Sequence, residues 1–195
     1  MKFFTKTLIL VSITGLFIAC GNQKKNNVDE SLSDSENIGY LKIVGDSVEI
    51  PYFEIELNLS EKAEEKLKTD NETVIVMAYF EGGITNIENV PEHYKDKIFA
   101  SRFLYFASHS IELTDKRLAR FENIKFSKDL YDLLDDKDIM VLINVFSGRK
   151  STGDNLLDVD ILQGTISEIK GKKFTLNGKL IGENDEDELA LSKTN

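Results

Sequence analysis

The most constraining feature of the sequence is the strict alternation of apolar and polar residues in FEIELNL, residues 53–59. Apolar side chains occupy the odd positions and polar ones the even positions, which is the period of a β-strand with one face in water. Just upstream, in residues 48–52, the apolar side chains occupy the even positions instead. A β-bulge near Pro51 would reconcile the two parities, since proline fits a bulge or an edge strand.

The rest of the chain continues this β pattern. Residues 73–80 and 138–146 are apolar at both parities, so we expect two central strands that are covered on both sides. Residues 60–68, with Ser60 as N-cap, and residues 127–134 predict short helices. Further strands are predicted at residues 38–44, 99–107, 111–114, 119–126, 156–163, 165–169 and 173–181. Because the long crossover helices of a parallel sheet are missing, the sequence predicts a mainly β fold, an antiparallel β-sandwich of about eight strands with two short helices, spanning residues 38–182.

The first nineteen residues have the three parts of a bacterial export signal. Lys2 and Lys6 precede an apolar run at residues 8–18, and a small residue, Ala19, precedes Cys20. The run is shorter than the roughly 20 residues with which a helix spans a bilayer. A permanent transmembrane anchor is therefore the weaker interpretation.

This segment resembles the lipobox of bacterial lipoproteins, roughly Leu-(Ala/Ser/Val/Ile)-(Gly/Ala/Ser)-Cys, at Phe17, Ile18, Ala19 and Cys20. Phe17 stands where the family has leucine. The resemblance implies that a diacylglycerol is attached to the Cys20 sulfur, that a lipoprotein signal peptidase cuts between Ala19 and Cys20, and that in many bacteria the new amine is acylated too. Two or three acyl chains anchor a protein stably, because each buried CH₂ contributes about 0.8 kcal/mol. The alternative is an ordinary signal peptide with a chance cysteine.

The composition on either side of the predicted sandwich favours flexible segments. Residues 20–37 are rich in Asn, Ser, Lys and acids, which is typical of a lipidated, flexible tether, and residues 183–195 form an acidic tail. By the same family resemblance, Gly21 after the cysteine favours the outer membrane over the inner one.

The charge balance limits the classes of partner. The formal net charge is −10, and removal of the segment with Lys2 and Lys6 lowers it to −12. Such a surface repels nucleic acid phosphates, so we expect no nucleic acid partner. It favours solubility, or else a basic partner. The single cysteine excludes an intramolecular disulfide.

Acidic loops flank the predicted strand 138–146 and raise the question of a metal. Asp136 and Asp138 precede this strand and Asp154 follows it, and carboxylates of this kind could bind Ca²⁺. Arg149 and Lys150 would repel the ion, so solvated acids are the favoured interpretation and no metal or other cofactor is expected.

Other candidate residues give weaker signals. His109 and Ser110 point to opposite faces of a strand and cannot form a hydrolase dyad directly. Asn144 could orient a ligand, but a satisfied core asparagine or a bulge is favoured. Ser47 lies in an Asp-Ser-Val triplet like the acceptor for O-glycosylation of exported proteins in some bacteria, at a predicted turn.

Three aromatic residues share one parity: Phe99, Phe103 and Tyr105. They could form a platform that stacks on sugars, but we interpret them as core.

These features predict a lipid-anchored protein of the cell envelope that acts as a non-catalytic binding or assembly module for another envelope protein, with the membrane contacted through its N-terminal lipid. The layout is loosely similar to that of the short transthyretin-like lipoproteins of type VI secretion membrane complexes, an analogy at the level of the fold alone. Two alternatives remain: an acidic inhibitor or immunity-type protein against a basic target in the periplasm, and a module that binds Ca²⁺ or carbohydrate.

Overall fold

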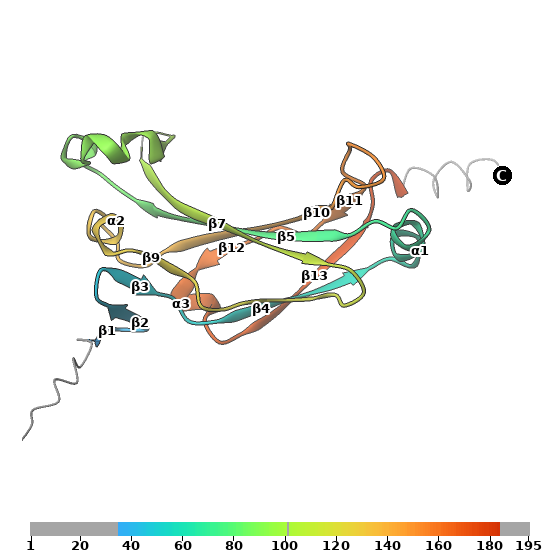
Figure 1. Cartoon of the computed structure of the whole chain (residues 1–195), viewed down its shortest axis with the longest axis horizontal. Helices are drawn as coiled ribbons and strands as arrows, with labels where there is room; N and C mark the ends of the chain where they lie inside the picture. The colour runs from blue at the N-terminus through green and yellow to red at the C-terminus, as the bar shows by residue number, and fades with distance from the viewer. Residues whose placement is uncertain (1–34, 101, 184–195) are drawn as a thin grey trace, which may run out of the picture. The chain divides into compact units, whose positions relative to one another are not determined.

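Three hydrogen-bonded sheets form the part of the chain that the computed structural model describes, residues 35–100 and 102–183 (Figure 1). The five-stranded sheet has the order β12 (Leu162–Thr165), β10 (Met140–Ser147), β5 (Val74–Gly83), β7 (Phe103–Leu113) and β6 (Ile98–Phe99). A four-stranded sheet has the order β11 (Leu157–Val159), β13 (Lys173–Leu180), β4 (Phe53–Leu59) and β8 (Leu118–Phe121). The remaining sheet has the order β1 (Ser35–Ile38), β2 (Leu41–Val44), β3 (Ser47–Glu49) and β9 (Lys125–Ser127).

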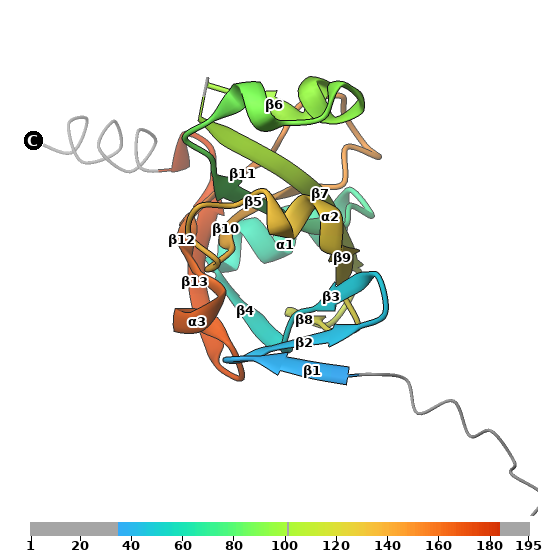
Figure 2. The ribbon, with the colours of Figure 1, turned by 90° about the vertical axis from the view of Figure 1, so that its left-hand side faces the viewer.

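The five-stranded sheet lies over the sheet of β4, β8 and β13, and the core fills the space between them (Figure 2). Phe80 and Ile55 are fully buried from the two sides, and the ring of Phe53 stacks on that of Phe121 with centroids 4.9 Å apart. The predicted mainly β sandwich is confirmed. Pairing is antiparallel throughout the described residues except between β4 and β13, which run parallel.

The change of parity near Pro51 coincides with a bend at which the chain passes from one sheet to another. The chain leaves β3 in one sheet and enters β4 in another, and the neighbouring ribbon from β8 to β9 makes the same crossing. Ile50 N donates to Ile124 O at 3.1 Å across the bend, and Asn123 takes a left-handed φ of 58°. The parity therefore reverses because the buried side of the chain changes with the sheet.

The described part of the chain contains three short α-helices and two 3₁₀ turns. The two predicted helices are present as α1 (Glu61–Thr69), capped by Ser60 Oγ accepting from Ala63 N at 3.1 Å, and α2 (Lys128–Asp132). The expected strand at residues 165–169 is wrong: α3 (Ile166–Ile169) forms there, because Thr165 and Glu168 make a capping box. The 3₁₀ turns are η1 (Ile87–Asn89) and η2 (Glu92–Lys97). No helix within residues 35–100 and 102–183 is long and apolar enough to cross a membrane.

The ends of the folded segment differ slightly from the expected bounds. β1 begins at Ser35, three residues earlier than expected, and Gly39 with a φ of 61° turns the expected strand 38–44 into the hairpin of β1 and β2. At the other end, the Glu183 carboxylate accepts hydrogen bonds from Ser60 Oγ at 2.7 Å and Leu180 N at 2.9 Å.

Candidate docking face

The outward side of the five-stranded sheet is unusually apolar for a surface. Residues at even positions of β5 face the core, and the odd positions face outward and are half-buried. The register carries the apolar character across to β10, where only Asn144 interrupts it, and to Tyr105 and Phe103 of β7. The β7 positions opposite Ile75, Met77 and Tyr79 are instead polar and exposed, and form the edge of this surface: Glu112, Ser110 and Ser108. We call the resulting surface the apolar face; its members are Ile75, Met77, Tyr79, Met140, Leu142, Phe146, Phe103 and Tyr105.

An outward sheet face in water normally carries polar side chains. Because β5 and β10 carry apolar residues at both parities, they were predicted to be covered on both sides. The structure corrects that prediction: within the described residues, only the core side is covered. A contiguous group of partly exposed apolar side chains on a sheet face is a candidate interaction site.

A bulge in β7 adds the aromatic residues to this face. Phe80 pairs with Ala107 and Glu81 with Tyr105, so that Phe106 is an extra residue in β7. The bulge reverses the parity of the strand, and Phe106 turns into the core while Tyr105 turns outward. The interpretation of Phe99, Phe103 and Tyr105 as core is wrong for this reason: Phe99 is 42% exposed and its ring stacks on Phe103 with centroids 5.6 Å apart.

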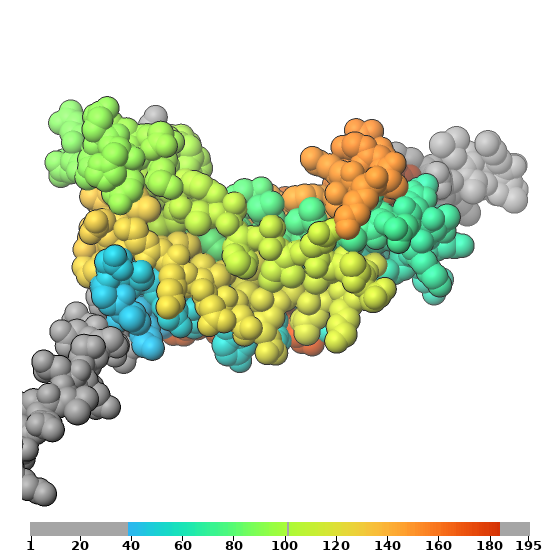
Figure 3. All heavy atoms as spheres, in the orientation of Figure 1, coloured from blue at the N-terminus to red at the C-terminus, as the bar shows by residue number. Residues whose placement is uncertain are grey.

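Two raised segments border the apolar face. The arm, residues 84–100 and 102, contains η1, η2 and β6, and the loop between β10 and β11 spans residues 148–156. Figure 3 shows the green arm and the orange loop rising on either side of a hollow above β5, β7 and β10. The apolar face therefore forms the floor of a depression with a wall at each end.

Each wall holds a cation over an aromatic ring of the floor. Lys97 Nζ from the arm lies 5.7 Å from the centroid of the Tyr105 ring and donates to Phe106 O at 3.4 Å. The Arg149 guanidinium from the loop lies 5.5 Å from the centroid of the Phe146 ring. Among the described residues, neither cation forms an ion pair. Such cation–π contacts leave the charge available to a ligand above the face.

The loop is held in place by a buried carboxylate that sequence reasoning missed. Glu72 is 5% exposed, and its two oxygens accept from Thr73 N, Lys150 N, Ser151 N and Ser151 Oγ at 2.8–2.9 Å. Burial raises the pKa of Glu72, but these hydrogen bonds outweigh it, so the net pKa is lowered. A lone Glu after a helix gives no sequence signal of this role, because Lys150 and Ser151 lie almost eighty residues further along the chain.

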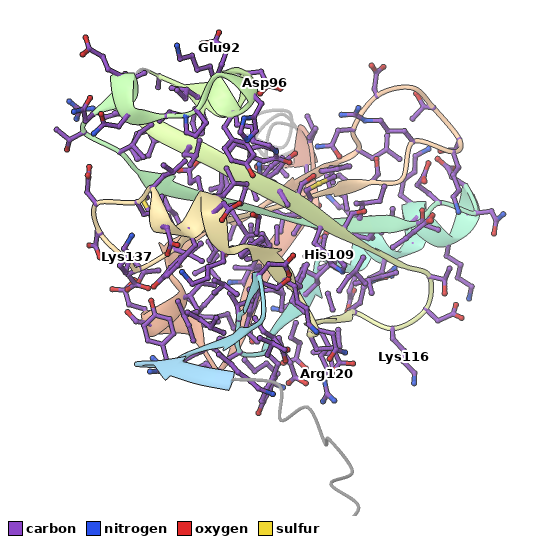
Figure 4. All side chains as sticks on the ribbon, turned by 60° about the vertical axis from the view of Figure 1, so that its left-hand side comes forward. Glu92, Asp96, His109, Lys116, Arg120 and Lys137 are labelled. Carbon is purple, nitrogen blue, oxygen red and sulfur yellow. The ribbon has the colours of Figure 1, made fainter. Side chains whose placement is uncertain are left out.

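The arm is attached through apolar contacts. Ile84 and Val90 are buried in the core cluster. At the end of β5, just before the arm, Gly82 packs against Leu134 in the segment after α2, and a Cβ at Gly82 would overlap the Leu134 side chain. Glu92 and Asp96 lie on the outer side of the arm (Figure 4). On the floor near the arm, Glu81 is half-buried, and burial raises the pKa of its carboxyl group.

The structure separates the aspartates considered as Ca²⁺ ligands. Asp136 and Asp138 precede β10 and Asp154 follows it, so about 25 Å of strand lies between them. Asp138 is also already engaged: one oxygen accepts from Tyr40 OH and from Ser167 N at 3.1 Å, and the other accepts from Ser167 Oγ. Within residues 35–100 and 102–183, no three His, Cys, Asp or Glu side chains are grouped as metal ligands.

The remaining candidates are placed as follows. His109 lies on the side of β7 that faces β8 (Figure 4), with its ring 6.0 Å from that of Phe121, and it is exposed to solvent. Ser110 pairs with Met77 on the outward side, so the two side chains point to opposite sides of the strand. Asn144 lies on the apolar side of β10 in the row of Met77, not in the core. Ser47 is in β3 and donates to Asp46 Oδ1 at 3.2 Å. Ala19 and Cys20 lie outside the described residues.

The outward side of the opposite sheet has a different character. Its acids on β4 and β11 are paired with cations on neighbouring strands: Glu54 with Arg120, Glu56 with Lys173 and Asp158 with Lys179. An Asn58–Asn177–Asp160 row of hydrogen bonds continues the pattern. This face is therefore a solvated, internally neutralised surface.

A cavity of about 640 Å³ lies beside α1. Its side chains include the fork in which Arg117 donates to both oxygens of Glu64 at 2.7 and 2.9 Å. These charges neutralise each other, so the cavity offers a ligand less than the apolar face does.

Comparison of the chain with models of protein families, with curated proteins and with solved structures gave no match.

Proposed function

We propose that this chain is a lipoprotein of the cell envelope, anchored through lipid on Cys20, whose β-sandwich binds a partner protein through the apolar face. The observation that carries the binding proposal is the uncovered outward side of β5 and β10. Most side chains of this face are apolar or aromatic and supply contact energy, which supports binding. The lipobox-like sequence at residues 17–20 supports the anchor, and Gly21 supports an outer-membrane location.

The alternative of an acidic inhibitor gains less support from the geometry. The acids on β4 and β11 are paired with neighbouring cations, so little free negative charge is presented there to a basic target.

Site-specific photo-crosslinking in the native cell tests the binding proposal. A photoreactive phenylalanine analogue is placed at Tyr79, in the centre of the apolar face, and, as a matched control, at Thr175, which is exposed on the opposite sheet. We expect a discrete protein adduct from position 79 and none from position 175. The adduct should disappear when Met77→Arg is added on the same strand. It should survive the matched control Leu118→Arg, at an exposed apolar position on the outward side of the opposite sheet.

Equal adducts from both positions, or an adduct that survives Met77→Arg, would show that the apolar face is not the binding surface. Circular dichroism of each variant confirms that it is folded.

A further inference from the structure

We infer that the occupant of the apolar face is a single amphipathic α-helix of the partner, with an acidic residue at each end of its apolar stripe. This inference rests on the proposed function and adds the chemistry of the partner to it.

The dimensions of the floor fit one helix. From the row of Phe146 and Ile75 to the row of Glu81 and Tyr105 is six residues of β5, or about 20 Å. The strands β7, β5 and β10 are neighbours, so their outer axes are roughly 10 Å apart, which is about the diameter of a helix. The floor thus measures a few hundred Å² at most, far below the roughly 800 Å² that each partner contributes to a standard interface between folded proteins.

The two raised segments argue against a second copy of the same sheet as the occupant. The arm and the loop rise at the two ends of the hollow (Figure 3), so a second copy of the same face could not settle onto the floor. An extended strand would need the backbone groups of a sheet edge, and the face of a sheet does not offer them. A helix lying between the walls would make contact through side chains alone, as in other helix-in-groove complexes.

The charges define the ends of the helix. Lys97 stands over Tyr105 at one end of the floor, in the same row as the half-buried Glu81. Arg149 stands over Phe146 at the other end, where the carboxylate of Glu112 is paired with Lys150. Carboxylates about 20 Å apart would meet both. At 1.5 Å per residue and 3.6 residues per turn, a spacing of about 14 residues gives this distance and keeps both carboxylates on the same side of the helix. Apolar residues at intervals of three and four between these acids would face the floor.

Binding of designed peptides to the full chain, held in phosphatidylcholine nanodiscs, tests this inference. The probe is a fluorescent 18-residue helix with a leucine stripe and glutamates at positions 2 and 16, about four turns apart on the same side. A matched peptide carries lysines there, and a third has the same composition without the stripe. Fluorescence anisotropy measures the affinities. We expect the lysine peptide to bind about tenfold more weakly than the glutamate peptide, and the peptide without the stripe not to bind.

The charge-reversed protein K97E/R149E provides the second part of the test. It should now prefer the lysine peptide. The control K68E/K116E makes the same change of net charge at exposed positions away from the face, and should keep the preference of the unmodified protein. If the preference does not reverse in K97E/R149E, or reverses equally in the control, the helix assignment is wrong.

The two proposals fail in different ways. A crosslink from Tyr79 together with peptides that bind regardless of their end charges would overturn the helix inference and leave the docking face standing. Absence of that crosslink would overturn the docking face itself.

Discussion

Replacing the buried acceptor Glu72 by glutamine should loosen the loop that forms one wall of the hollow. The carboxylate accepts four hydrogen bonds, three of them at one oxygen. Glutamine keeps one oxygen but places an NH₂ group against a backbone N–H and removes the charge that strengthens all four bonds. A hydrogen bond to a charged group contributes about 1.5–3 kcal/mol and a neutral one about 1 kcal/mol. Allowing for the carboxylate's burial cost, which glutamine avoids, we expect a loss of about 2 kcal/mol in the free energy of unfolding.

Thermal and urea unfolding measure this change. For a domain of this size, 2 kcal/mol corresponds to a fall in Tm of about 4–8 °C. The matched control is Glu65→Gln on the exposed side of α1, which should leave Tm unchanged within about 1 °C.

The stability difference between wild type and Glu72→Gln should depend on pH in a direction set by the pKa of Glu72. The pKa of Glu72 is lower in the folded state than its ordinary value of 4.5, so its contribution to stability is present above pH 4.5 and is lost as the pH falls through the folded pKa. The difference between wild type and Glu72→Gln should therefore be largest near pH 7 and shrink in strongly acidic buffer. If the two proteins unfold together at pH 7, the loop is not held by Glu72.

Three further changes test other parts of the account. Cys20→Ser should abolish labelling by radioactive palmitate and leave the precursor uncut by the lipoprotein signal peptidase; a variant that still matures and stays with the membrane would refute lipidation. Gly148→Ala places a Cβ 2.0 Å from Thr73 Oγ1 and should cost about 1–3 kcal/mol in urea unfolding, whereas Gly153→Ala, whose Cβ meets nothing within 4 Å, should cost far less. Tyr40→Phe removes the hydroxyl that donates to Asp138 and should cost about 1–2 kcal/mol by thermal unfolding; an unchanged Tm would show that this bond does not hold the hairpin of β1 and β2 to β10.

The sequence predicted the local elements well where one physical signal dominated. The alternation in residues 53–59 and the cap at Ser60 correspond to β4 and α1, and the apolar run before Ser147 corresponds to β10. These patterns depend on neighbours in the chain, which a single sequence contains.

The features that depend on distant contacts could not be predicted in this way. The bulge at Phe106, which turns Tyr105 outward, is defined by pairing with β5. The change of parity at Pro51 pointed to an irregularity, but only the tertiary arrangement shows that it is a passage between sheets. The predicted strand at residues 165–169 is wrong because a capping box forms a helix there, and the β-branched residues obscured this local signal.

The candidate site was missed for a related reason. Apolar residues at both parities of β5 and β10 predicted burial on both sides, because sequence alone does not say whether a second layer covers the sheet. In the structure the outward side chains of these strands are partly exposed, which turns a prediction of core into a candidate docking face.

Oxidation of methionine tests the docking of a partner most directly. The chain has three methionines, and both of those beyond Met1, Met77 and Met140, lie on the apolar face. Hydrogen peroxide is applied to the purified protein and to intact native membranes, and sulfoxide is quantified by mass spectrometry; a third methionine introduced as Thr175→Met on the opposite sheet serves as the internal reference. We expect both native methionines to oxidise several-fold more slowly in membranes than in the purified protein, with position 175 unchanged. Equal rates for Met77 and Met140 in the two preparations would show that nothing covers the apolar face in the cell.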